Sequence, residues 1–225
     1  MLRTFSIFLL LLLTSEGAQA NTAWWDVASV RVSEVTDTQP PTVFALEEHC
    51  NSYVSPQRLG VDSIQWTAIV LVGEKVWSIV EANKPVVNFN TQVVHALPQG
   101  LPCWSTLEHW QAPTVKSYEV KYINGFGMEV VKFRFRLQYT SGGGTGESGL
   151  YIANATIVAS ELTVMWGYTF DAGLSVEQPV NLGTRLNPVV GLELNLNWKV
   201  RTVLKESQSS VGFFIQGDGV STLLN

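Results

Sequence analysis

Apolar and polar residues alternate along most of the chain after Pro113. In residues 131–139 the side chains of Val, Phe, Phe, Leu and Tyr alternate with those of Lys, Arg, Arg and Gln, and similar alternation recurs in 118–122, 162–168 and 192–200. Neighbouring side chains of a strand point to opposite faces, so each segment has one buried face and one solvated face. With turn residues between the segments, this pattern predicts an antiparallel β-sandwich or a partly open barrel in the C-terminal half.

Two local features sharpen this prediction. The dipeptide Asn124-Gly125 separates two alternating segments and predicts a hairpin, because a type I′ turn requires positive φ at both central residues. Trp166 and Trp198 fall on the apolar phase of their segments, so both are expected in the core.

The chain before Pro113 is less regular. Residues 63–82 carry apolar side chains at spacings of three and four, which predicts one α-helix, ended by Asn83-Lys84-Pro85. The β-branched residues in 69–72 leave an alternative, in which a strand up to Val72 precedes a shorter helix.

Two further segments of this half are predicted without a helix. The sequence VASVRVSEV near the N-terminus has valines close to a period of two and predicts a short strand. Residues 85–113 contain four prolines, so an irregular connection is expected there.

The first 20 residues have the features of a bacterial-type secretory signal peptide. Arg3 precedes an apolar run over 5–13, and Ala18-Gln19-Ala20 forms a small-x-small cleavage site. The run is shorter than the ~20 residues that a membrane-spanning helix needs, so removal is expected rather than anchoring. We therefore expect export to the periplasm, the medium or the cell surface, with 21–225 forming a single β-rich domain and a subdomain boundary near 113 as the alternative.

The two cysteines, Cys50 and Cys103, are expected to form a disulfide that ties the irregular segment down. In the chain-entropy model, closing so long a loop stabilises the fold by about 4 kcal/mol. The alternative is a metal site that includes His49 and His109. Zinc sites usually contain closely spaced ligand pairs, which this sequence lacks, so the disulfide is preferred and no metal is expected.

The charge composition bears on the kind of partner. The formal net charge is −5 and only 15% of the residues are charged, against about 25% in a typical globular protein. An acidic chain without a basic cluster is not expected to bind nucleic acid. The low charge and the eight tryptophans favour a surface covered by a protein or glycan partner, by a second copy of the chain, or by a membrane.

A glycine-rich stretch satisfies the spelling G-x-G-x-x-G at residues 144–149. A dinucleotide-binding loop needs a buried parallel strand before it and a helix after it, whereas here an amphipathic segment precedes it and a β-branched segment follows. We therefore predict a flexible hairpin loop and no cofactor. Its glycines are Gly142, Gly143, Gly144, Gly146 and Gly149.

Few side chains suggest chemistry. His109, with Glu108 beside it and Ser105 nearby, is the best candidate for a general base, but sequence adjacency does not supply the geometry of a catalytic set, and no catalytic residue is assigned. Adjacent tryptophans in an extended segment point to opposite sides, so one of Trp24 and Trp25 is a candidate for contact with a partner. Trp110 is a third candidate.

The function predicted from the sequence is that of an exported, non-enzymatic β-sandwich that binds a protein or a glycan or forms part of an extracellular assembly. A first alternative is membrane insertion, as a small barrel or a pore-forming hairpin made from 130–139 and 150–158. A second alternative is a secreted hydrolase whose carboxylates meet only in the folded chain.

Overall fold

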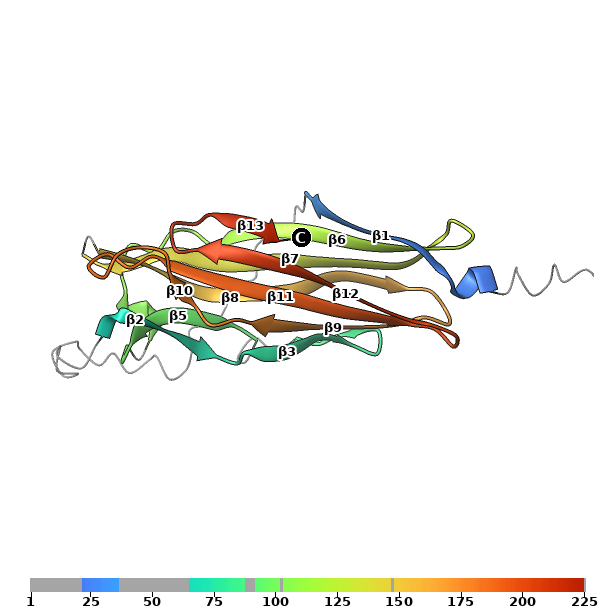
Figure 1. Ribbon diagram of the computed structural model, residues 1–225, viewed down its shortest axis with the longest axis horizontal. Coiled ribbons are helices and arrows are strands. Elements are labelled where there is room, and N and C mark those ends of the chain that lie inside the picture. Colours follow the sequence, from blue (N-terminus) through green and yellow to red (C-terminus); the bar gives the residue numbers. More distant parts are fainter. Residues whose placement is uncertain (1–21, 37–64, 88–91, 102, 147, 225) are drawn as a thin grey trace, which may run out of the picture.

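The protein consists mainly of β-strands arranged in two antiparallel sheets (Figure 1). The computed structural model describes residues 22–36, 65–87, 92–101, 103–146 and 148–224. The six-stranded sheet, here called sheet A, has the order β1-β6-β7-β8-β5-β2. Its strands are β1 (Val27–Val35), β6 (Thr114–Asn124), β7 (Glu129–Thr145), β8 (Ser148–Val164), β5 (Val94–Gln99) and β2 (Gln65–Gly73).

The seven-stranded sheet, here called sheet B, has the order β13-β12-β11-β9-β3-β4, with β10 paired to β11. Its strands are β13 (Ser221–Leu224), β12 (Glu206–Gln216), β11 (Val190–Arg201), β9 (Thr169–Val176), β3 (Val76–Glu81), β4 (Lys84–Pro85) and β10 (Val180–Asn181). One helical turn covers residues 22–25, and a 3₁₀ turn, η3, covers Trp104–Thr106.

The inner faces of the two sheets form one core, which is the arrangement of a β-sandwich. Aromatic rings meet across it: the ring centroids of Phe133 and Phe170 lie 4.9 Å apart, as do those of Tyr118 and Phe213. The apolar residues of the alternating segments supply this core. The prediction of antiparallel sheets is confirmed for the C-terminal half. A single buried side is found in β9 and β11, whereas residues 135–144 of β7 and 151–157 of β8 are buried on both faces.

The predicted helix over 63–82 is wrong, because these residues form strands β2 and β3. The alternative was right about the strand up to Val72 and wrong about the helix after it. Strand β3 contains a register shift between Ser78 and Val80, and both Ile79 and Val80 are buried. Such a bulge breaks the period of two and produces the spacing of three and four that favoured a helix.

Residues 85–113 are also more regular than expected, since β5 runs through them between β8 and β2 in sheet A. The strand predicted near the N-terminus is confirmed as β1, which pairs with β6. Strands from both sides of Pro113 therefore contribute to both sheets.

Both predicted hairpins, β6–β7 and β7–β8, are present, and the turn between β6 and β7 differs from the predicted one. Strands β6 and β7 are joined through residues 125–128, and the positive φ, of 78°, occurs at Gly127 rather than at Asn124-Gly125. Asn124 stabilises the turn, because its side-chain oxygen accepts hydrogen bonds from the backbone N–H groups of Phe126 and Met128, both at 3.0 Å. The turn is thus longer than the predicted type I′ turn.

The two tryptophans predicted for the core differ in their exposure to solvent. Trp198 is buried, and its indole N–H donates to the Tyr122 hydroxyl at 2.9 Å across the sandwich. Trp166 is 83% exposed, so its prediction was wrong. Trp166 lies in the turn after β8, which ends at Val164, and in a turn the alternation along the strand no longer decides which way a side chain points.

Candidate functional site

A row of small, uncharged residues crosses the outer face of sheet B. The strand register aligns Ser78 of β3 with Gly173 of β9, Gly173 with Asn197 of β11, and Asn197 with Ser210 of β12. The hydroxyl groups of Ser78 and Ser210 have no hydrogen-bond partner among the described residues, and the Asn197 amide donates to the backbone oxygen of Asn195 at 3.2 Å. The row therefore offers polar groups to a ligand without first breaking side-chain pairs.

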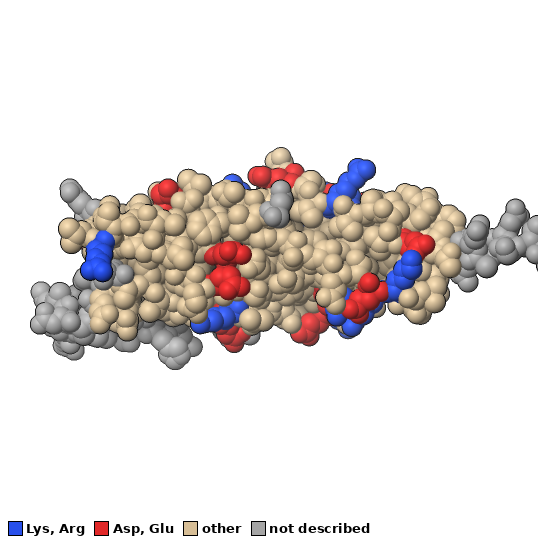
Figure 2. All heavy atoms as spheres, viewed as in Figure 1, with Lys and Arg blue, Asp and Glu red and all other residues tan. Residues whose placement is uncertain are grey.

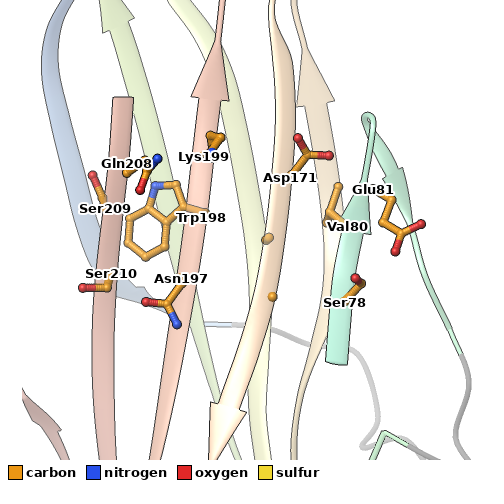
Figure 3. Close-up of a pocket in the computed structure, with 12 residues that line it drawn as sticks. Ser78, Val80, Glu81, Asp171, Asn197, Trp198, Lys199, Gln208, Ser209 and Ser210 are labelled. Carbon is orange, nitrogen blue, oxygen red and sulfur yellow. The ribbon is translucent and has the colours of Figure 1, made fainter. Parts of the chain in front are cut away.

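The surface is hollowed along this row (Figure 3). A cavity of about 590 Å³ extends over the four strands, within the size range of small-molecule sites. Gly173 causes much of the hollow, because it has no side chain where its neighbours Ser78 and Asn197 have theirs. A Cβ atom built on Gly173 would lie 3.3 Å from the Trp77 backbone oxygen, which is closer than an ordinary contact, and within 4 Å of no other atom outside its chain neighbours.

A second row, next to the first, carries charge at the rim of the groove. The register aligns Asp171 with Lys199 and Lys199 with Gln208. Both charged members have other partners: Asp171 pairs with Arg201 and accepts a hydrogen bond from the Ala82 N–H at 2.7 Å, and Lys199 pairs with Glu206 at 3.0 Å. Glu81 of β3 also lines the groove and is exposed, so the lining contains two acidic side chains and one basic side chain.

Aromatic stacking is not available from the floor of the groove. Trp198 lines it, but the indole is only 3% exposed and its N–H is used in the core. In Figure 2, which faces sheet B, charged residues form separate clusters with uncharged surface between them. A ligand here would be held mainly by hydrogen bonds to amide and hydroxyl groups, as uncharged polyhydroxyl compounds can be.

Two carboxylates, those of Glu81 and Asp171, line the groove. Asp171 pairs with Arg201 and accepts a hydrogen bond from the Ala82 N–H. Among the residues that the structure describes, no three His, Cys, Asp or Glu side chains come together as a metal site would require.

His109, the candidate base of the sequence analysis, lies elsewhere. It is an exposed loop residue with positive φ, and its ring nitrogen is 3.9 Å from the Glu108 carboxylate. His95 is buried in sheet A, where its ring stacks on Trp104 and its Nδ1 accepts a hydrogen bond from the Asn154 N–H at 3.1 Å. The structure does not bring these two histidines to the groove.

The predicted glycine loop is mostly strand. Gly142, Gly143 and Gly144 belong to β7 and Gly149 to β8, so that only Gly146 remains in the turn. Trp110 leaves no room for a side chain at Gly143, because a Cβ there would lie 2.3 Å from the indole ring. Trp110 thus packs on the hairpin, and its N–H donates to the Trp104 backbone oxygen at 3.2 Å.

Trp24 and Trp25 lie in the helical turn at the beginning of the described chain. Trp24 packs against the core, while the Trp25 ring lies 6.3 Å from that of Trp166 and 6.1 Å from that of Tyr168. These tryptophans lie at one end of the sandwich and do not line the groove in sheet B. Of the two, Trp25 is the one that lies beside the exposed ring of Trp166.

Cys103 is buried at the start of the η3 turn, where its backbone oxygen accepts hydrogen bonds from Thr106. Cys50, His49 and the signal peptide lie outside the described residues. The disulfide and the leader therefore stay predictions.

Comparison with protein-family models, with curated protein sequences and with solved structures gave no match for this chain. Among the described residues no helix is long and apolar enough to cross a membrane. The groove was missed in the sequence because its residues come from four strands, with Ser78 and Ser210 far apart in the chain. The polar positions of 192–200 include asparagines where other strands have charged residues, and this could have pointed to the groove. The sequence did not show which strands lie beside this segment.

Proposed function

We propose that the protein is an exported, non-enzymatic binding module, and that sheet B binds an uncharged glycan along the row Ser78, Gly173, Asn197 and Ser210. The observation that carries this proposal is the hollow over Gly173, lined by amide and hydroxyl groups with spare hydrogen-bonding capacity. A sugar chain presents many hydroxyl groups that can both donate and accept, which matches such a surface. The absence of an exposed ring in the groove favours weak binding, with affinity gained from several sugar units.

A protein partner is the main competitor for the groove. Stable protein interfaces are centred on buried aromatic or aliphatic anchors, and the central row of the groove has none. The shallow, polar surface therefore supports the glycan better.

The test uses calorimetric titration with soluble fragments of neutral α-glucan, β-glucan and mannan. Gly173→Val would fill the hollow with a residue that suits a strand, and binding should fall at least about tenfold. Ser175→Val, one position along the same face of β9 but outside the groove lining, is the matched control and should bind normally. If none of the fragments binds, or if Gly173→Val binds as well as the unchanged protein, the proposed glycan site is wrong.

The membrane-inserting hairpin of the sequence analysis has less support. The apolar side chains of β7, including Phe133 and Phe135, are fully buried between the sheets, so lipid exposure of this hairpin would require the core to open. For the hydrolase alternative, the carboxylates that line the groove are those of Glu81 and Asp171, and Asp171 pairs with Arg201.

Export and the disulfide belong to the same proposal. A chain exported to an oxidising compartment would join Cys103 to Cys50. Mass spectrometry of the protein recovered from the native cell should find an N-terminus at Asn21 and a mass that rises by two protons only after reduction. A free thiol at Cys103 would rule the pairing out.

A further inference from the structure

The side of the sandwich that carries β1 and β12 is one strand short. Strand β13 pairs with β12 only over residues 212–215, so in the described part of the chain residues 206–211 of β12 have no strand on that side. In Figure 1, β13 ends near the middle of the molecule, and β1 runs along the same side to the right of it. Sheet B therefore has an open edge along the first half of β12.

Sheet A reaches past this edge. Strand β6 lies across the core from β12, since the hydroxyl groups of Tyr122 and Ser209 are 3.2 Å apart. Further along the same two strands, the rings of Tyr118 and Phe213 are 4.9 Å apart. Strand β1 is the next strand outward from β6 in sheet A. The position across from β1, beside residues 206–211, is thus not filled by any strand that the structure describes.

The inner face of the sandwich is uncovered at this position. Val30 and Val32 of β1 point to the inner face, because their partners in β6 are buried. Leu223 of β13 points the same way, since its partner Phe213 is buried. Each of the three side chains is nevertheless 37% exposed. Glu34, the next residue of β1 on this face, lies beyond the gap and across from β13.

The backbone of β12 indicates what kind of molecule fits the gap. The Gln216 N–H donates to the Val220 backbone oxygen at 2.8 Å, so it points towards β13. The backbone groups of successive strand residues point to alternate sides, so those of Gln208 and Ser210 point to the open edge. A row of N–H and C=O groups at strand spacing is matched by another extended peptide backbone.

This edge lacks the features that protect other edges of the two sheets. Strands β1 and β2 of sheet A contain register shifts, and β4 of sheet B has two residues, one of them Pro85. Residues 207–211 have no register shift in their pairing with β11, no proline and no charged side chain. Bulges, prolines and charges on edge strands prevent pairing with other chains. A regular, uncharged edge therefore favours such pairing.

We propose that the open edge of β12 binds an extended segment of another polypeptide as an added strand, with its apolar side chains over Val30, Val32 and Leu223. Its backbone pairs with that of Gln208 and Ser210, and every second side chain faces the core. A folded second copy offers, apart from the same part of β12, only edge strands that contain register shifts or have at most four residues. The proposal rests on backbone groups and the inner face, so it is independent of the glycan groove on the outer face.

The test is an NMR titration of the purified protein with the capped peptide Lys-Val-Thr-Val-Thr-Val. Its valines alternate with polar residues, whereas the control peptide Lys-Thr-Thr-Val-Val-Val has the same composition without alternation. At about 1 mM, the alternating peptide should slow the hydrogen exchange of the Gln208 and Ser210 amides at least about threefold. The control peptide should leave their exchange unchanged.

Two pairs of variants locate the bound strand. Gln208→Pro removes the N–H that pairs with the peptide and should weaken binding at least about fivefold, whereas Gln208→Ala keeps it and should change binding less than about twofold. Proline is tolerated where the N–H faces an open edge, so β12 should stay paired with β11. Val32→Ser, on the inner face of β1, should weaken binding at least about threefold, and Arg31→Ser, on the outer face, should not. The second pair decides the matter if Gln208→Pro does not fold.

Four outcomes overturn the proposal. Three are a lack of protection by the alternating peptide, equal protection by both peptides, and equal binding by the two members of each variant pair. The fourth is sedimentation that shows dimers of the unchanged protein and monomers of Gln208→Pro, because the occupant of the edge would then be a second copy. Gly173→Val should bind the alternating peptide normally, which separates this test from that of the glycan site.

Discussion

The outer faces of the two sheets share the same cross-strand geometry but carry different kinds of side chain. Sheet A carries the cross-strand row Glu119, Arg134 and Glu161, whereas sheet B carries Ser78, Gly173, Asn197 and Ser210. In the row of sheet A each charged side chain meets an opposite charge, so the row is complete by itself. In sheet B the side chains are small and neutral, so the row is open to an outside partner.

Glu119 shows how completely the row in sheet A is satisfied. Its side chain is only 6% exposed and receives Lys121 at 2.9 Å and Arg134 at 2.6 Å. Burial by itself would raise the pKa of Glu119, but the hydrogen bonds and charges of Lys121 and Arg134 outweigh burial, and the pKa falls below its ordinary value. The comparison teaches that polarity alone does not mark a binding surface; what matters is whether the polar groups already have partners.

The largest expected effect comes from removing the shared acid of sheet A. Glu119→Gln leaves the cations around it without their carboxylate, and the free energy of unfolding should fall by about 2 kcal/mol. Urea denaturation measures the change. Glu206→Gln on sheet B breaks an exposed pair with Lys199 and serves as the control, for which little change is expected. Equal losses in both variants would contradict the contrast between the faces.

Acid should remove the same contribution. Because the pKa of Glu119 is lower in the folded chain than its ordinary value of 4.5, its contribution to stability is present at neutral pH and is lost as the pH falls below 4.5. The difference in unfolding free energy between the unchanged protein and Glu119→Gln should therefore shrink between about pH 7 and about pH 3. A difference that is constant over this range would show that the ionised carboxylate does not stabilise sheet A.

A smaller effect on stability is expected at the centre of sheet B. Gly173→Val adds a β-branched residue to a strand, which favours the fold, but its Cβ would lie 3.3 Å from the Trp77 backbone oxygen, so the free energy of unfolding should change by less than about 1 kcal/mol. The thermal midpoint, measured by circular dichroism, should change little while glycan binding falls. A loss of stability as large as that of Glu119→Gln would mean that the hollow is needed for the fold rather than kept for a ligand.

The smallest effect is expected for Ser210→Ala. The Ser210 hydroxyl is exposed and has no partner among the described residues, so stability should change by less than about 0.5 kcal/mol. Glycan affinity should fall about threefold, since one neutral hydrogen bond is lost. Stability that falls as much as in Glu119→Gln would show that sheet B, like sheet A, is held by its outer polar groups.

The sequence predicted the strands that obey strict alternation and failed where a local irregularity changed the phase. Strands β6, β7 and β11 were recognised because one residue in two must face the core. The bulge in β3 mimicked a helix, and Trp166 was assigned to the core because a strand was extended past its end. The groove could not be predicted, since Ser78, Gly173 and Asn197 carry no motif and become neighbours only through strand order.

The sequence by itself determined that the C-terminal half forms antiparallel sheets, because the period of side chains along a strand is fixed by backbone geometry. It also determined that the glycine-rich stretch joins two strands. Only the tertiary structure decided which strands are neighbours, where the uncharged row of sheet B lies, and which strand segments are buried on both faces. These features depend on pairing between segments that are distant in the chain. The free energy of that pairing comes from contacts throughout the core, so no short segment of the sequence reveals it.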